Sequence, residues 1–218
     1  MFKVRPVLLL SGMMVLLAIG GGAKADPQTR VDAEKGIALA QNRLGCQFET
    51  GVSEIQNYEL SGYWYLKAAN QGLPVAEFNL AVLNMSARAQ LPFDARENAI
   101  TLFRRSAEKG LLSSILFLAV IYEEGVGIEP DLSNAHTFYL VASSLGSVFG
   151  SERKDLVEKK LRFDQIKNSQ QRAFKWIEEN SIEDRRKKLV EQVPCRSVFH
   201  KTETEIQLFV RSHTVSYK

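Results

Sequence analysis

The chain has 218 residues, of which 45% are hydrophobic and 24% are charged, enough for one domain of moderate size or an array of short repeats. Its formal charge of +3 comes from the first 25 residues, which hold three basic residues and no acidic one, so the remainder is formally neutral. A neutral chain lacks the positive charge on which nucleic-acid binding depends, and we expect no nucleic-acid partner.

Residues 1–25 have the pattern of a cleaved secretory signal peptide. Lys3 and Arg5 form a basic head, an apolar run over 7–19 follows, and residues 23–25 give the small-x-small pattern of a cleavage site. We expect cleavage after Ala25, a periplasmic or secreted mature chain, and no transmembrane segment within it. The alternative is an uncleaved membrane anchor.

Three similar tracts then follow at nearly regular intervals. WYLKAANQG ends at Gly72, LFRRSAEKG at Gly110 and FYLVASSLG at Gly146, so the intervals are 38 and 36 residues. Each tract has two bulky residues, two small ones and a closing glycine. A helix-like pattern precedes each tract. We interpret the bulky residues as core, the small ones as sites of close helix approach, and the glycine as a left-handed helix cap.

The third unit, residues 115–146, shows the pattern most completely. Apolar residues at three- and four-residue spacing predict two helices, which Gly125 and Gly127 separate. Asp131 or Ser133 can cap the second helix. A single helix pair cannot bury both apolar stripes, so it requires neighbours of the same kind.

This pattern resembles the Sel1-like repeat family, which is related to the tetratricopeptide repeat. The family pattern is roughly A-x-x-x-L-G-x-x-Y, then G-x-G-V-x-x-D, then K-A-x-x-W-Y-x-K-A-A-x-x-G, and the third unit matches it almost throughout. The middle unit departs most, because Asn84 stands where tyrosine is usual and its loop has no glycine. The resemblance implies an all-α fold, a right-handed α/α solenoid of three helix pairs at 33–72, 73–110 and 111–146.

Two further segments follow the repeats. Residues 147–180 predict two amphipathic helices, broken near residues 163–164, and their ending looks like the capping helices of many secreted Sel1-like proteins. Residues 181–218 form a tail outside the repeats. Its alternating apolar residues at 197–199, 205–210 and 214–217 suggest short strands or an extended chain.

Cys46 and Cys195 are the only cysteines, in a chain expected to reach an oxidising compartment. Such a pair is more often bonded than catalytic, so a Cys46–Cys195 disulfide is one interpretation. Two unpaired thiols, one of them bonding a partner, are the other.

We expect no catalytic, cofactor or metal site. The histidines His136, His200 and His213 are far apart in sequence and lack a second ligand at metal spacing. The sequence Gly-Val-Gly at 125–127 has no third glycine and no preceding strand, so it is not a nucleotide-binding loop. Some secreted, cysteine-rich relatives are linked to β-lactam binding, but this chain lacks their paired cysteine in each repeat. A β-lactam- or cell-wall-related hydrolase is therefore the rival hypothesis.

The first helix of each pair is expected to line the concave side of the solenoid. Two residues beyond each core leucine, at about 200° from it, lie Cys46, Val82 and Val120. The neighbouring turns complete the predicted groove with Asn42, Glu49, Phe78, Met85, Leu116 and Glu123. The middle of this groove is apolar, and a soluble protein should not leave such a strip bare.

Three explanations for the apolar strip stay open. A partner segment fills it, the protein's own tail around 198–210 fills it with Cys46 bonded to Cys195, or strong curvature buries it between helices. The sequence thus predicts a non-enzymatic protein–protein interaction module, an adaptor, regulator or inhibitor of an envelope or secreted protein. An alternative is an immunity protein that neutralises a phospholipase-type effector, because some immunity proteins of that kind resemble this design.

Overall fold

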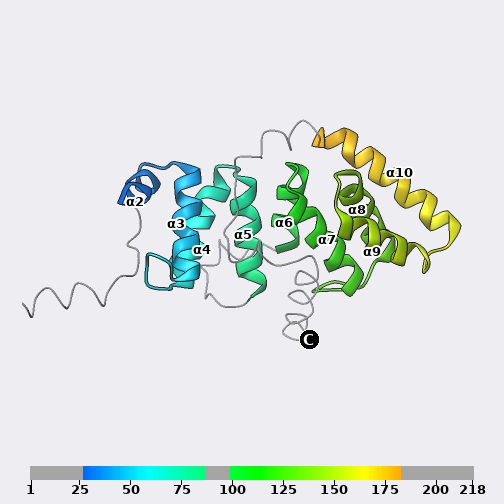
Figure 1. The fold of residues 1–218 in the computed structure, drawn as a ribbon, viewed down its shortest axis with the longest axis horizontal. Coiled ribbons are helices and arrows are strands. Elements are labelled where there is room, and N and C mark those ends of the chain that lie inside the picture. The colour runs from blue at the N-terminus through cyan, green and yellow to red at the C-terminus, as the bar shows by residue number, and fades with distance from the viewer. Residues whose placement is uncertain (1–26, 87–98, 183–218) are drawn as a thin grey trace, which may run out of the picture.

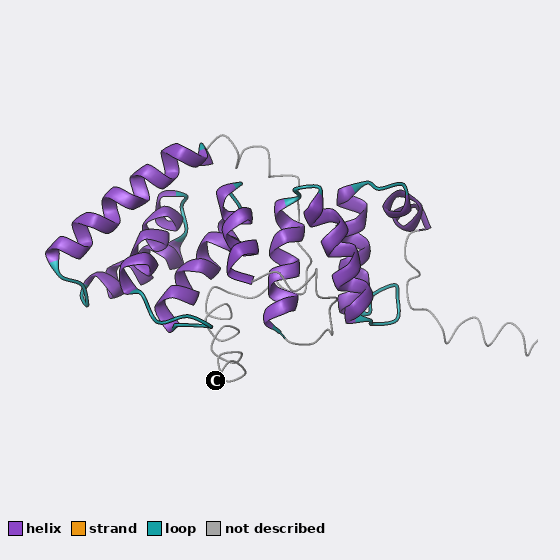
Figure 2. Ribbon diagram, turned by 180° about the vertical axis from the view of Figure 1, so that it is seen from behind, coloured by secondary structure: helices purple, strands orange, loops and turns teal. Residues whose placement is uncertain are grey.

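The computed structural model describes residues 27–86 and 99–182, and within them the chain forms nine helices and no strand (Figures 1 and 2). The helices are α2 (Pro27–Glu34), α3 (Ala38–Thr50), α4 (Tyr58–Asn70), α5 (Pro74–Met85), α6 (Ala99–Glu108), α7 (Leu112–Glu124), α8 (Leu132–Ser144), α9 (Val148–Glu158) and α10 (Phe163–Asn180). None of these helices is long and apolar enough to cross a membrane.

The helices form pairs that follow one another in a row, α3 with α4, α5 with α6 and α7 with α8 (Figure 1). The second helix of each pair also packs against the first helix of the next pair, so a continuous core runs along the row. The all-α solenoid expected from the repeats is confirmed. The signal peptide, the loop of the middle repeat and the tail with its expected strands lie outside the described residues.

The closing glycines end the second helices with the same backbone hydrogen bonds in each repeat. Gly72 donates to the carbonyl of Ala69 at 2.8 Å, and the following amide donates to the carbonyl of Ala68 at 3.3 Å. The φ angle of Gly72 is +80°, which L side chains rarely adopt, and the corresponding angles at Gly110 and Gly146 are +92° and +86°. This is the Schellman pattern of helix termination.

A fourth copy of this ending occurs at the start of the first predicted repeat, ahead of α3. Gly36 has a φ of +93°, and its amide donates to the carbonyl of Ala33 at 3.0 Å. Helix α2 is therefore the second helix of an incomplete preceding pair. The sequence carried the signal, because Ala-Glu-Lys-Gly occurs at both 33–36 and 107–110.

The core positions of the repeat are filled as the pattern predicts. Leu44, Leu80 and Leu118 are fully buried, as are the second bulky residues Tyr65, Phe103 and Tyr139. Small residues permit this packing. A Cβ at Gly45 would lie 2.7 Å from the Tyr65 ring, which is too close for any heavy atom.

The last two helices close the row in different ways. Helix α9 follows Gly146 just as α5 follows Gly72, and it packs against α8 as a further first helix. Helix α10 returns to pack on α8 and lies across that end of the molecule (Figure 1). The Trp176 ring meets the Phe138 ring edge-on at 5.8 Å. These helices are the predicted caps.

Candidate interaction surface

The residues of the predicted groove occupy equivalent positions on the first helices α3, α5 and α7. The structure places the apolar ones inside the protein, each with at most 4% of its surface exposed: Phe78, Val82, Met85, Leu116 and Val120. Phe78 lies against the rings of Phe103 and Phe117 at 5.5 and 5.1 Å, so it joins α5 to α6 and α7. That a partner contacts these side chains stays a prediction.

Asn42 links two neighbouring repeats. It accepts a hydrogen bond from the amide of Asn79 at 2.9 Å, and both side chains are buried. A buried amide needs such a partner, because an unpaired polar group in the core costs on the order of 1–3 kcal/mol. Asn42 therefore sets the register of α3 against α5.

The two acidic groove residues accept hydrogen bonds from core tyrosines. Tyr65 donates to Glu49 at 2.7 Å, and Tyr139 donates to Glu123 at 2.8 Å, each across 16 residues. Burial, reinforced by the nearby carboxylate, raises the pKa of both tyrosines, so both stay protonated donors. Glu123 also accepts a hydrogen bond from, and forms an ion pair with, the guanidinium of Arg153, which joins the third repeat to α9.

The middle repeat replaces both members of this pair together. Met85 stands where the other repeats have Glu49 and Glu123, and Phe103 stands where they have Tyr65 and Tyr139. Both residues are buried. Replacing only one member would leave a buried polar group without its hydrogen bond, whereas replacing both leaves an apolar contact.

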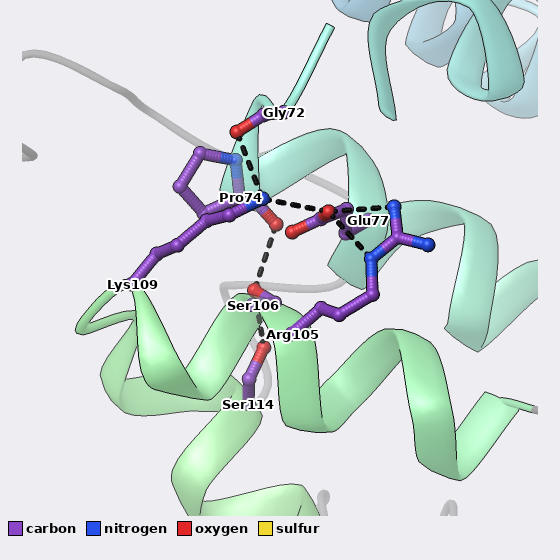
Figure 3. Close-up of polar contacts among 7 residues, drawn as sticks. All are labelled: Gly72, Pro74, Glu77, Arg105, Ser106, Lys109 and Ser114. Atoms are coloured by element: carbon purple, nitrogen blue, oxygen red, sulfur yellow. Dashed lines mark hydrogen bonds and ion pairs between the residues drawn. The ribbon is translucent and has the colours of Figure 1, made fainter. Parts of the chain in front are cut away.

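A second polar cluster, around Glu77, was not predicted from the sequence (Figure 3). The Glu77 side chain is fully buried, and its Oε1 atom accepts from Lys109 at 2.7 Å and from the Nη2 and Nε atoms of Arg105 at 2.8 and 3.0 Å. Lys109 also donates to the carbonyl of Gly72 at 3.1 Å. The cluster therefore joins α5 to α6 within the second repeat, and through Lys109 it also reaches the preceding closing glycine.

The first repeat makes the same connection with neutral groups. Gln71, which also precedes a closing glycine, donates to the carbonyl of Gly36 at 2.9 Å and to Gln41 at 2.7 Å. In the third repeat the equivalent residues are Leu145 and Ile115, and both are buried and apolar. This pair of positions therefore holds amide side chains in the first repeat, charged side chains in the second and hydrocarbon side chains in the third.

Exposed large apolar side chains in the described residues gather at the two ends of the row. Those at the first end are Val31, Ile37, Val52, Ile55, Leu60 and Tyr63, and those at the far end are Val148, Leu156, Phe163 and Phe174. The described helices α5 to α8 carry none of them. The ends are therefore the open apolar surfaces of the described chain.

The stripe Leu60, Tyr63, Trp64 and Lys67 runs along the outer face of α4, and we call it the α4 stripe. Its spacing places all four residues on one side of the helix. The Tyr63 and Trp64 rings meet edge-on at 5.2 Å, and the Lys67 ammonium lies 4.5 and 5.1 Å from their centres. Sequence reasoning assigned Trp64 to the core, whereas the structure leaves it half-buried beside the exposed Tyr63.

The equivalent stripe on α8 is covered by α10. Thr137 and Phe138 correspond to Tyr63 and Trp64, and both are buried. Arg172 donates to the Thr137 hydroxyl at 3.3 Å, and Trp176 covers Phe138. The fold thus contains one helix docked on a position of the repeat that α4 presents uncovered.

His136 has a structural role. It is fully buried, its Nδ1 atom lies 2.6 Å from the Ser169 hydroxyl, and its Nε2 atom lies 3.4 Å from Glu158. Burial lowers the pKa of His136, although the Glu158 carboxylate opposes this effect. Within 27–86 and 99–182, no three histidine, cysteine or acidic residues are grouped as a metal site would need. His200 and His213 lie outside these ranges.

Cys46 is half-buried on α3 and is disulfide-bonded. The only other cysteine of the sequence, Cys195, lies outside the described residues. The Cys46–Cys195 pairing therefore stays a prediction.

Comparison with known proteins gives a consistent result. The family model of the Sel1 repeat matches residues 38–73, 74–111 and 112–147. Over 146 residues the chain is 29% identical to chitin synthase regulatory factor 3 of Schizosaccharomyces pombe, an alignment that covers 64% of this chain and 16% of that protein. Over 155 residues it is 28% identical to the putative sel1-like repeat-containing protein L21 of Acanthamoeba polyphaga mimivirus, covering 71% of this chain and 27% of that protein.

The solved structures show the same architecture. A Sel1 repeat protein from Oxalobacter formigenes superposes with a TM-score of 0.50 and 24% identity, covering 59% of this chain and 95% of that one. The chain spans only a small part of the length of the curated relatives it matches. Repeats of this kind typically mediate contacts between proteins.

Proposed function

Because the chain belongs to the Sel1 repeat family, we propose that it is a periplasmic, non-enzymatic protein–protein interaction module that regulates or inhibits an envelope or secreted protein. The observation that supports this most directly is the α4 stripe, an exposed aromatic surface at a position of the repeat that elsewhere in the chain holds a docked helix.

The proposed partner contact is an amphipathic helix laid along α4. Aromatic side chains that are rigid and partly exposed are the residues that most often dominate protein interfaces. The α10 helix on α8 shows how such a helix would sit, with its apolar side toward the stripe. The Lys67 ammonium beside the rings favours a partner helix with an acidic residue at that end.

The ionisable groups of the first helices support a binding role over a catalytic one. Glu49, Glu77 and Glu123 each bond to residues of the paired helix, so they hold the two helices of each repeat together. Such carboxylates, fixed by structural partners, are not poised to transfer protons to a substrate. The hydrolase alternative has no comparable supporting feature.

The test is affinity purification of the mature chain from cell-envelope extract. The wild type is compared with Leu60→Asp plus Tyr63→Asp, which places two charges on the α4 stripe. The matched control is Val148→Asp plus Phe174→Asp, which alters two exposed apolar residues at the far end. We expect one partner to be retained by the wild type and the control and lost by the α4 variant. A partner that the folded α4 variant retains would contradict the proposed surface.

The identity of the partner separates the finer alternatives. If it is a phospholipase-type toxin that the purified chain inhibits at stoichiometric concentration, the immunity role is supported. If the purified chain alone hydrolyses a chromogenic β-lactam, the non-enzymatic proposal is wrong. N-terminal sequencing of the protein from a periplasmic fraction tests the predicted start at Asp26.

A further inference from the structure

The first helices of the second and third repeats are buried on every side. Four consecutive residues of an α-helix go once around its axis, since each turns by about 100°. In α5 the residues 80–83, and in α7 the residues 118–121, all have 4% or less of their surface exposed. In α3, by contrast, the equivalent Cys46 and Gln47 are only half-buried.

The described helices occupy only some of the sides of α5 and α7. Helix α5 packs against α4 and α6, and α7 packs against α6 and α8. Links between successive first helices, such as Asn79 to Asn42 and Phe117 to Phe78, take up the sides facing the adjacent repeats. The side predicted to be concave remains, where helical geometry places Val82 and Val120, and both are buried. A helix that is apolar all round requires a cover on that side too.

We propose that the C-terminal tail, residues 183–218, is the built-in occupant of this concave surface, and that a disulfide between Cys46 and Cys195 fixes its position there. Two observations besides burial support this occupant. Cys46, at the position of α3 equivalent to Val82 and Val120, is disulfide-bonded, and Cys195 is the only other cysteine in the chain. The last described residue, Ile182, is fully buried in the main core, so the tail starts from a fixed point.

The reach and composition of the tail fit this assignment. Successive first helices lie about 10 Å apart, and an extended chain covers about 3.3 Å per residue. With Cys195 bonded to Cys46, the roughly fifteen residues that lead to Val210 are more than sufficient to pass Val82 and Val120. That stretch contains the alternating apolar residues of the tail, Val198, Phe199, Ile206, Leu208 and Val210. A strand with alternating apolar and polar residues can place its apolar face on the groove and its polar face in water.

The inference concerns the chain itself and does not depend on the α4 stripe or on any partner. It makes the groove a surface already filled, so a partner would reach it only by displacing the tail. The experiment therefore uses the purified mature protein alone, and its failure would leave the proposed function untouched.

Photo-crosslinking tests the assignment in the full mature chain. Phe199 is replaced by the photoreactive p-benzoylphenylalanine, which preserves an aromatic apolar side chain, and crosslinked peptides are mapped by mass spectrometry. The matched control carries the same group at Phe163, which is 82% exposed at the start of α10. We expect crosslinks from position 199 to reach α3, α5 or α7 within one molecule, and none from position 163 to do so. Crosslinks from position 199 that reach only other helices, or only other molecules, would overturn the proposal.

A second measurement tests the covalent link independently. Non-reducing peptide mapping of the periplasmic protein should show a peptide pair containing Cys46 and Cys195. Two free thiols, or a bond between two chains, would refute the fixed tail. In Cys46→Ser plus Cys195→Ser, we expect unchanged helicity and faster hydrogen exchange over 74–85 and 112–124. Exchange that is unchanged there would also count against the proposal.

Discussion

The Glu77 cluster gives the most direct test of how the two helices of the second repeat are joined. Glu77→Gln preserves the shape of the side chain and removes its charge. The carboxylate accepts three bonds from Lys109 and Arg105 at 2.7–3.0 Å and is completely buried. Hydrogen bonds to charged groups contribute about 1.5–3 kcal/mol each. The Arg105 and Lys109 side chains are 39% and 32% exposed, however, so water recovers part of the loss.

We therefore expect Glu77→Gln to lower the free energy of unfolding by about 2–3 kcal/mol, well below the sum of three bonds. Urea denaturation followed by far-ultraviolet circular dichroism measures this as a lower midpoint at constant slope. The matched control is Glu179→Gln, which removes a carboxylate that pairs with Lys175 at 3.5 Å on an exposed face of α10. We expect the control to change stability by less than about 0.5 kcal/mol.

A salt dependence distinguishes the buried cluster from an exposed ion pair, because salt screens a buried pair less than an exposed one. The difference between wild type and Glu77→Gln should persist in concentrated sodium chloride. If Glu77→Gln is as stable as the Glu179→Gln control, or if salt removes the difference, then the cluster does not hold α5 against α6.

The other predictions follow the same reasoning. Gly110→Ala adds a Cβ to a residue with a φ of +92° and should lower the free energy of unfolding by roughly 1–2 kcal/mol in urea denaturation. Gly150→Ala adds a Cβ at a normal φ and therefore tests crowding alone. A Gly110→Ala variant of unchanged stability would contradict the role of Gly110 as a helix cap. Tyr139→Phe removes the hydrogen bond to Glu123 and should lower the free energy of unfolding by about 1.5–3 kcal/mol. The double variant Tyr139→Phe plus Glu123→Met copies the middle repeat, and its loss of stability should be smaller than the sum of the two single losses. Burial keeps the pKa of His136 below its unfolded value of 6.5, so stability is full above that pH and declines as the pH falls below it. The His136→Gln variant should lose this part of the pH dependence, and an unchanged profile from neutral to acidic pH would refute the assignment.

The fold was predictable because its signals are local. A closing glycine, two small residues and two bulky ones recur at a fixed spacing, and each has a role that needs only its own helix pair. Gly36 was also within reach, since its Ala-Glu-Lys-Gly context repeats the one before Gly110. It was missed because α2 lacks the bulky pair that marks the other second helices.

The interactions between helices were not predictable in the same way. Glu77 meets Arg105 and Lys109 only because α5 and α6, which lie apart in sequence, pack against each other with a particular offset. The burial of Val82 and Val120 shows the same limit. Helical geometry gives the direction of each side chain, but what covers it depends on segments remote in sequence. The surface on α4 was missed because the pattern assigns the first bulky residue of every repeat to the core, and in the first repeat that residue is Trp64.

The three repeats share one backbone but join their own two helices with different chemistry. At the position before the closing glycine, the first repeat uses Gln71, the second uses Lys109 and the third uses Leu145, each with a matching residue on a first helix. A buried ion pair matched against an apolar surface would leave charge without a partner, at a cost of several kcal/mol. Because both members of each pair belong to the same repeat, the chemistry at this position can change only when the two members change together.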